Sequence, residues 1–328
     1  MLQLPTGNAI CYSGYRRGQS PGDKTYPSRA EIREDLAILH KHWRLLRLYD
    51  CSPHADRVLE VIEADGLPFK VMLGAYLGAE MNNLGCPWGA TFTQDQLEAS
   101  QRENGAEIER LIALARRYPD IVFSVAVGNE ATVDWTDHLV PVPQMIEYVR
   151  RVKKAVAQPV TFCENYLPWQ TKLRELVPEL DFISLHTYPL WEFKPIHEAI
   201  DYTRENFDSV ARRYPETPVV ITEAGWATRS NGRGMNAEHA SPELQARYYR
   251  DLMAWTQQAG ILTFVFEAFD EPWKGSPDPL EPEKHWGLFT VDRQPKRVMQ
   301  GLYPEFAEPD ALAEVAAPAN VAEPRCPP

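Results

Sequence analysis

The sequence predicts an α/β fold, a (β/α)8 barrel of the triosephosphate isomerase (TIM) type formed as a single domain. Short apolar runs alternate with longer stretches of helical period, which is typical of buried parallel strands joined by helical crossovers. Eight such runs occur, which is the count of a closed barrel, and no Gly-x-Gly-x-x-Gly follows the first of them. The barrel is therefore preferred to a doubly wound sheet. A length of 328 residues suits one such barrel with insertions.

The predicted elements follow in order along the chain. The strand candidates are Ala9 to Tyr12, Leu45 to Tyr49, Phe69 to Leu73, Ile121 to Val127, Val160 to Cys163, Phe182 to Leu185, Val219 to Thr222 and Ile261 to Phe266. The crossover helices are Arg29 to His40, Leu97 to Tyr118, Val142 to Val156, Ile196 to Tyr214 and Pro242 to Gln258. Ser241 followed by Pro242 is a sound start signal for the last of these helices, because proline is favoured at the first helical position.

Charge and hydropathy exclude several classes of partner. The chain carries 34 basic and 46 acidic side chains, a formal net charge of −12. An acidic chain repels nucleic-acid phosphates and anionic lipid, so a neutral or cationic small-molecule substrate fits better. No stretch approaches the ~20 apolar residues of a membrane span, so no direct membrane insertion is expected.

The ends of the chain and its cysteines bear on location. Five cysteines without Cys-x-x-Cys spacing are consistent with an intracellular protein or a periplasmic one that uses cysteine loosely. Residues 1–5 lack the basic and apolar regions of a signal peptide, so either the chain is cytosolic or a signal was removed, and a periplasmic or other extracytoplasmic location is favoured. Residues 305–328 are rich in Pro, Ala and Glu, which predicts a plain tail or a linker to another module from which the 1–304 domain was excised.

Two glutamates stand where a barrel carries its chemistry, at the C-terminal ends of its strands. Glu130 ends the fourth apolar run and Glu223 ends the seventh, and these two positions can face each other across the barrel mouth. A retaining glycosidase needs two carboxyl groups about 5–5.5 Å apart, one to protonate the leaving oxygen and one to attack the anomeric carbon. A single strand-end glutamate usually caps a helix or forms a surface ion pair, but two in matching positions favour catalysis. Asn129 is placed to hydrogen-bond a sugar 2-hydroxyl.

These motifs resemble the family 17 glycoside hydrolases, of the bacterial type, which are β-1,3-glucan-active barrels with catalytic glutamates after strands four and seven. The resemblance covers nearly the whole barrel and is most specific in its last two segments. The matching segments are Ile10 to Gly14, Arg47 to Asp50, Val127 to Glu130, His186 to Pro189, Thr222 to Trp226, Phe266 to Lys274 and Glu283 to Phe289. Ala224 and Trp286 replace a threonine and a phenylalanine of the plant members, which leaves the assignment standing.

The resemblance implies that Glu130 is the acid/base and Glu223 the nucleophile, with Glu271, Lys274 and Glu283 as a charged set that supports them. On the residues alone, a lysine within reach of two carboxylates would hold the nucleophile ionised, while a less polar surrounding would raise the pKa of the acid.

The remaining candidates are mainly aromatic residues at predicted strand ends, where an exposed ring can stack on a sugar. Most tryptophans pack in cores or at rims, so only some of these rings are expected to touch substrate. Tyr12, Tyr188 and Trp286 are the predicted sugar contacts, and Trp191 with Glu192 resembles the acceptor-side pair of fungal glucan-transferring relatives. Arg47 is predicted to be a buried partner of a catalytic carboxylate, and the full binding or supporting set is Tyr12, Arg47, Asn129, Asn165, Tyr188, Trp191, Glu192, Trp226, Glu271, Lys274, Glu283 and Trp286.

No metal or other cofactor is expected. His186 follows the sixth run, but no second His or Cys stands at ligand spacing, so His186 is interpreted as a hydrogen-bonding residue at the barrel top. Neither a Gly-x-Ser-x-Gly elbow nor a phosphate loop supports an esterase or a nucleotide-binding protein.

The predicted function is cleavage of β-1,3-glucan with retention, through a covalent glucosyl-enzyme intermediate. If water takes up the intermediate, the protein is a glucanase; if a sugar hydroxyl does so, it is a β-glucanosyltransferase. The alternative is a barrel that binds β-glucan without turning it over.

Overall fold

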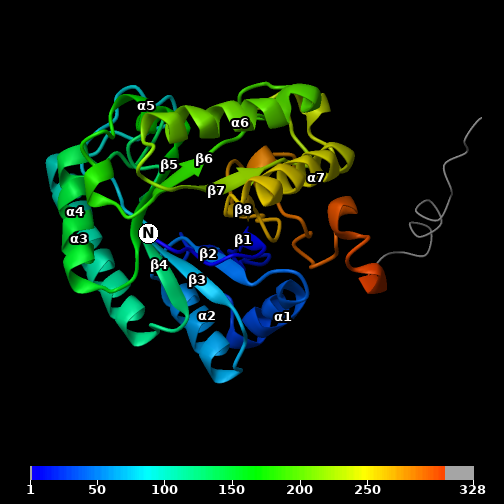
Figure 1. The fold of residues 1–328 in the computed structure, drawn as a ribbon, viewed down its shortest axis with the longest axis horizontal. Coiled ribbons are helices and arrows are strands. Elements are labelled where there is room, and N and C mark those ends of the chain that lie inside the picture. The colour runs from blue at the N-terminus through cyan, green and yellow to red at the C-terminus, as the bar shows by residue number, and fades with distance from the viewer. Residues whose placement is uncertain (1, 307–328) are drawn as a thin grey trace, which may run out of the picture.

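The computed structural model describes residues 2–306, and its centre is a closed barrel of eight parallel strands (Figure 1). Strands adjacent in sequence are adjacent in the barrel, and β8 closes onto β1 with Phe264 opposite Ala9. The strands are β1 (Ala9–Cys11), β2 (Leu45–Leu48), β3 (Lys70–Ala75), β4 (Val122–Asn129), β5 (Val160–Asn165), β6 (Ile183–His186), β7 (Val219–Gly225) and β8 (Thr263–Phe266). The predicted fold class is confirmed.

Seven α-helices of the described chain surround this barrel (Figure 1). They are α1 (Arg29–His40), α2 (Pro53–Ala64), α3 (Gln94–Arg117), α4 (Val142–Ala155), α5 (Tyr166–Thr171), α6 (Ile196–Arg213) and α7 (Pro242–Ala259). Neither α2 nor the six-residue α5 was predicted from the sequence. Helix α3 begins three residues before its predicted start, because Thr93 and Gln96 form a capping box that starts the helix at Gln94.

The predicted start of α7 is confirmed, since the Ser241 side chain accepts a hydrogen bond from the Leu244 N–H and Pro242 occupies the first turn. Gly260, with a φ of 66°, ends the helix in the left-handed region. After β8 the described chain forms no further α-helix, only short 3-10 helices at Pro282–Lys284, Arg297–Met299 and Pro304–Phe306. The many prolines between residues 272 and 304 oppose an α-helix there.

The limits of the described chain bear on two predictions. Among residues 2–306, no helix has the length and apolar character that crossing a membrane requires. The predicted tail, residues 305–328, overlaps the last 3-10 helix by two residues, and its part from 307 onward lies outside the described residues.

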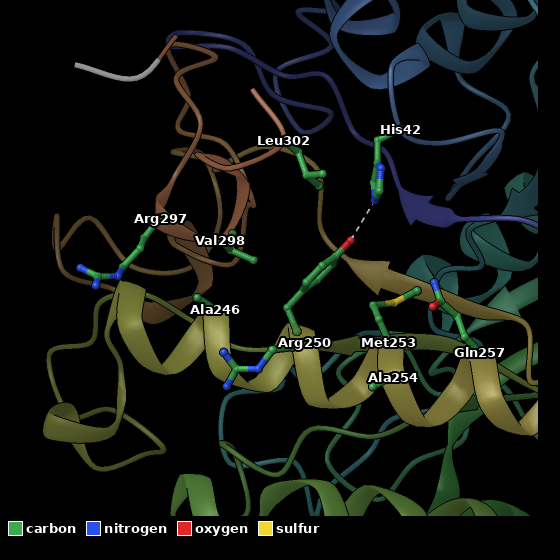
Figure 2. A pocket seen from close by; sticks show the side chains of 10 residues that line it. His42, Ala246, Arg250, Met253, Ala254, Gln257, Arg297, Val298 and Leu302 are labelled. Atoms are coloured by element: carbon green, nitrogen blue, oxygen red, sulfur yellow. Dashed lines mark hydrogen bonds between the residues drawn. The ribbon is translucent and has the colours of Figure 1, made fainter. Parts of the chain in front are cut away.

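A groove of about 500 Å³ lies between α7 and the segment that follows β8 (Figure 2). Met253 on α7 and Val298 and Leu302 opposite line it, and the Tyr249 hydroxyl lies 3.4 Å from Nε2 of His42. None of the predicted site residues line this groove.

Candidate active site

Glu130 follows β4 directly, in a turn that the Gly-Asn-Glu sequence makes possible. Gly128 has a φ of 90°, and a Cβ at this position would lie 3.0 Å from Met145 and 3.1 Å from Phe162. Glu130 itself has a φ of 45°, which is uncommon for a non-glycine residue and is held only where the surroundings over-determine it. Here the Glu130 N–H donates to the Cys163 carbonyl on β5 at 2.9 Å. The turn leaves the Glu130 side chain 28% exposed at the barrel mouth.

Glu164 on β5 holds the chain just beyond this turn. Its carboxyl group accepts hydrogen bonds from the Thr132 N–H at 2.9 Å, the Thr132 hydroxyl at 2.7 Å and the Asn165 N–H at 2.7 Å. Burial, and then repulsion from Glu130, raises the pKa of Glu164 to about 7, although these hydrogen bonds lower it. No role for Glu164 was predicted from the sequence. Its place directly after a buried apolar run could have marked it as a residue of the barrel mouth.

Glu223 lies inside β7, so the sheet itself fixes its position. The Arg47 guanidinium from β2 bonds one carboxylate oxygen, and the Tyr188 hydroxyl donates to the other. Burial would raise the pKa of Glu223, but the charges of His186 and Arg47 and the Tyr188 bond outweigh it and lower the pKa to about 2. Glu223 is therefore ionised at neutral pH. Arg47 also donates to the Asn129 side chain, so it ties β2, β4 and β7 together.

His186 stands between the two glutamates. Its Nδ1 lies 2.9 Å from Oε1 of Glu130 and 3.5 Å from Oε2 of Glu223. One oxygen from each glutamate and a His186 nitrogen all lie within 4.8 Å of one another. Burial would lower the pKa of His186, but Glu223, a hydrogen bond with Cys163 and Glu130 together raise it to about 10. The ring therefore carries a positive charge at neutral pH.

One imidazole and two carboxylates are also a set of side chains that can bind a metal ion. This set was not recognised from the sequence, because only a second His or Cys was considered as a partner of His186. The 2.9 Å contact between His186 Nδ1 and Glu130 agrees with the interpretation of His186 as a hydrogen-bonding residue at the barrel top. Its two carboxylate partners were not identified from the sequence.

The charged set predicted to support the catalytic pair surrounds different carboxylates. Lys274 lies 3.0 Å from Glu267 and also contacts Glu271. The expectation that Lys274 holds Glu223 ionised is therefore corrected, because the cations in contact with Glu223 are Arg47 and His186. Lys274 follows Glu271 by three residues in the loop after β8, and this short separation lets the two side chains form an ion pair.

Three carboxyl groups share the charge of Lys274. Burial, and then repulsion from Glu271, raises the pKa of Glu267. Burial would raise the pKa of Glu271 as well, but Lys274 and hydrogen bonds from Glu267 and Ser13 lower it. Burial raises the pKa of Glu283, against the attraction of Lys274. The pKa values of the two neighbouring carboxyl groups are therefore shifted in opposite directions.

Three of the predicted aromatic or supporting residues are buried beneath the site. The Tyr12 hydroxyl donates to Asp35 at 3.0 Å, and the Trp226 indole donates to the His239 carbonyl at 2.8 Å. Trp286 is fully buried. The prediction that Tyr12 and Trp286 stack directly on sugar is therefore wrong, because neither ring reaches the surface.

Tyr188 and Trp191 are half-buried and pack on Trp286, with ring centroids 5.2 and 5.6 Å from its own. Glu192, next to Trp191, is exposed. Asn165 uses its side-chain oxygen to cap α5, accepting from the Leu167 N–H at 3.0 Å. Of the predicted set, Tyr188 bonds Glu223 and is partly exposed, as is Trp191, and Glu192 is exposed, while Asn165 has a structural bond.

The fold and this site define a β/α barrel with paired carboxylates at the C-terminal mouth, the arrangement typical of barrel glycosidases. Residues 9–287 match the model of the BtgE/BtgC glycoside hydrolase domain, so the chain belongs to that family.

Named relatives agree with this assignment. A "Glucan 1,3-beta-glucosidase" from Arthroderma benhamiae is 24% identical over 306 residues, which are 86% of this chain and 88% of that protein. A "Probable glucan endo-1,3-beta-glucosidase btgC" from Aspergillus clavatus is 25% identical over 82% of this chain, and the match spans only 39% of that longer protein.

Solved structures resemble the fold closely. An endo-laminarinase from Formosa has a TM-score of 0.77 and 29% identity, covering 91% of this chain and 87% of its own. A glycoside hydrolase family 17 β-1,3-glucanosyltransferase from Rhizomucor miehei has a TM-score of 0.70 and 23% identity, covering 89% and 96%.

Proposed function

We propose that this protein is a family 17 retaining glycosidase or transglycosylase that acts on β-1,3-glucan. The separation of Glu130 and Glu223 carries the proposal, because their oxygens lie within 4.8 Å of each other. Retaining enzymes hold their carboxyl groups about 5–5.5 Å apart, whereas inverting enzymes leave about 6.5–9.5 Å for a water molecule. The names of the fungal relatives and of the Formosa laminarinase support β-1,3-glucan as the substrate class.

In the first step, the ionised Glu223 attacks the anomeric carbon as the glycosidic bond breaks. The bonding electrons move to the glycosidic oxygen, which takes a proton from Glu130, and a glucosyl ester forms on Glu223. Arg47 and Tyr188 hold the two Glu223 oxygens in place before the attack. The low pKa of Glu223 suits a nucleophile, and the partly exposed side chain of Glu130 is accessible to the glycosidic oxygen.

In the second step, Glu130 accepts a proton from an incoming hydroxyl group, whose oxygen attacks the anomeric carbon and releases the Glu223 carboxylate. Water as the acceptor gives hydrolysis, and a sugar hydroxyl gives transfer. Trp191 and Glu192 favour transfer because they offer an acceptor surface, although a hydrolase also needs a site for the leaving sugar. The proposal therefore includes both glucanase and glucanosyltransferase activity. The pair of glutamates argues against a barrel that only binds glucan.

Product analysis on laminari-oligosaccharides tests the proposal. Shorter products alone indicate hydrolysis, longer ones indicate transfer, and an unchanged substrate that still binds would indicate the binding barrel. Glu130→Gln and Glu223→Gln should each abolish turnover of unactivated glucan. With an aryl glucoside that needs no proton donor, Glu130→Gln should still form the intermediate, and azide should speed its release.

Glu147→Gln is the matched control, because Glu147 is an exposed residue on the outer helix α4 and should leave turnover unchanged. Near wild-type activity in Glu223→Gln would overturn the assignment of the nucleophile.

A further inference from the structure

A second groove, of about 460 Å³, lies between the segment after β3 and the first turns of α3. Its lining includes Tyr76, Phe92, Gln96, Ser100, Asp137 and His138, and we call it the Tyr76 groove. Tyr76 follows β3 directly, and β3 pairs in parallel with β4, the strand that ends beside Glu130. The groove therefore opens on the flank of the site that carries the proposed acid/base.

His138 attaches this groove to the Glu130 turn. Its Nε2 lies 2.9 Å from the Asn129 carbonyl oxygen and its Nδ1 lies 2.7 Å from the Asp137 carboxylate. Both partners can accept hydrogen bonds, which favours a ring with a proton on each nitrogen. Burial would lower the pKa of His138, but Asp137 and the Asn129 carbonyl raise it. Asp137 balances this charge, so the groove presents a paired, nearly neutral wall.

Tyr76 supplies the apolar wall. Its side chain is 45% exposed, and its ring lies 4.8 Å from the His138 ring between centroids. The Tyr76 hydroxyl is 3.1 Å from His138 Nδ1, which holds the phenol ring in one orientation. An exposed aromatic ring beside polar groups suits a pyranose, whose C–H face is apolar and whose edge carries hydroxyls.

We propose that the Tyr76 groove is an additional glucosyl-binding subsite, which takes a sugar unit of the same β-glucan chain remote from the bond at Glu130. This inference rests on the proposed function. The occupant follows from the hydrogen bond that joins His138, in the groove wall, to the Asn129 carbonyl next to Glu130, and from the balanced charge of the groove, which fits a neutral sugar better than an ionic ligand. Long oligosaccharides that fill the groove are then better substrates than short ones.

The test compares kcat/KM along the laminari-oligosaccharide series for the whole chain and three variants. Tyr76→Ala should reduce the ratio of kcat/KM for laminarihexaose to that for the shortest cleaved oligosaccharide by about tenfold, the cost of losing one well-packed aromatic contact. Ala99→Trp, which fills the groove from the exposed side of α3, should do the same without removing Tyr76. Trp88→Ala removes another exposed ring, 60% exposed, from the same loop but outside the groove, and should leave the ratio unchanged.

An unchanged ratio in both Tyr76→Ala and Ala99→Trp would overturn the subsite, as would an equal fall in Trp88→Ala. Melting temperatures of each variant separate misfolding from lost binding. If wild type binds laminarihexaose without cleaving it, the proposed function fails, and calorimetric titration then decides the subsite: an affinity about tenfold weaker in both groove variants supports it, and an unchanged affinity overturns it. If wild type neither binds nor cleaves the oligosaccharides, both proposals fail.

Discussion

Replacing His186 by glutamine should change the pH dependence of stability in a way that the structure makes quantitative. The charged ring contacts Glu130 and Glu223 in the folded protein, where its pKa is about 10 against 6.5 for an unperturbed histidine. Because the folded value is the higher one, the stabilisation is fully present below pH 6.5 and is lost as the pH rises through 10. At 1.36 kcal/mol for each unit of pKa, the ring stabilises the native state by about 5 kcal/mol at pH 6 but only about 1.5 kcal/mol at pH 9.

The assay is urea unfolding of wild type and His186→Gln at pH 6 and pH 9, with free energies from linear extrapolation. The free energy of unfolding of wild type minus that of His186→Gln should be about 3 kcal/mol larger at pH 6 than at pH 9. His54→Gln is the control, because burial lowers the pKa of His54. The difference in free energy of unfolding between wild type and this variant should change by less than about 1 kcal/mol from pH 6 to pH 9, and in the opposite sense. A difference between wild type and His186→Gln that is constant from pH 6 to pH 9 would refute the reasoning.

Further predictions concern three other residues. Lys274→Met should lower the free energy of unfolding by about 3–5 kcal/mol, because it leaves the buried Glu267 and Glu271 without their cation. Urea unfolding measures this change. Unchanged stability with a higher KM would instead place Lys274 in substrate binding. Burial and repulsion from Glu130 raise the pKa of Glu164 to about 7, so the free energy of unfolding of wild type should fall relative to Glu164→Gln as the pH rises from 4.5 to 7, and unfolding at pH 5 and pH 8 checks this. Trp191→Ala should reduce the ratio of transfer to hydrolysis products at high oligosaccharide concentration, since an acceptor held near the intermediate competes with water; an unchanged ratio with a large fall in melting temperature would count against the acceptor surface.

The sequence was sufficient for the barrel because local pattern and local chemistry both specify it. The apolar run from Val160 predicted a strand, and the structure extends that strand only to Asn165. Ser241 and Pro242 mark the start of α7 because a cap is a bond between near neighbours. The six-residue α5 was missed because its local signal is weak, whereas α2 was missed although Ser52 and Pro53 give it the same kind of start signal as α7. After β8 the chain forms short 3-10 helices in place of an eighth α-helix.

The same logic located the carboxylates and one of their partners, Arg47, but not the others. Glu130 and Glu223 could be placed at the barrel mouth because strand ends in a parallel barrel all point to one face. Arg47 was predicted to be a buried partner of a catalytic carboxylate, and it does bond Glu223, 176 residues away. Lys274 was also assigned to the nucleophile, but it contacts Glu267 and Glu271 instead. The sequence also left the partners of His186 unnamed.

Which aromatic side chains are buried also depends on the tertiary structure. Trp286 and Tyr12 lie at strand ends by sequence, but packing covers both rings, whereas Tyr76 in the loop after β3 remains exposed. Strand order and strand ends are determined by patterns that repeat along the chain, so the sequence alone specified them. Which charge meets which carboxylate, and which ring meets solvent, depends on distances between segments far apart in the chain, and only the closed barrel sets those distances.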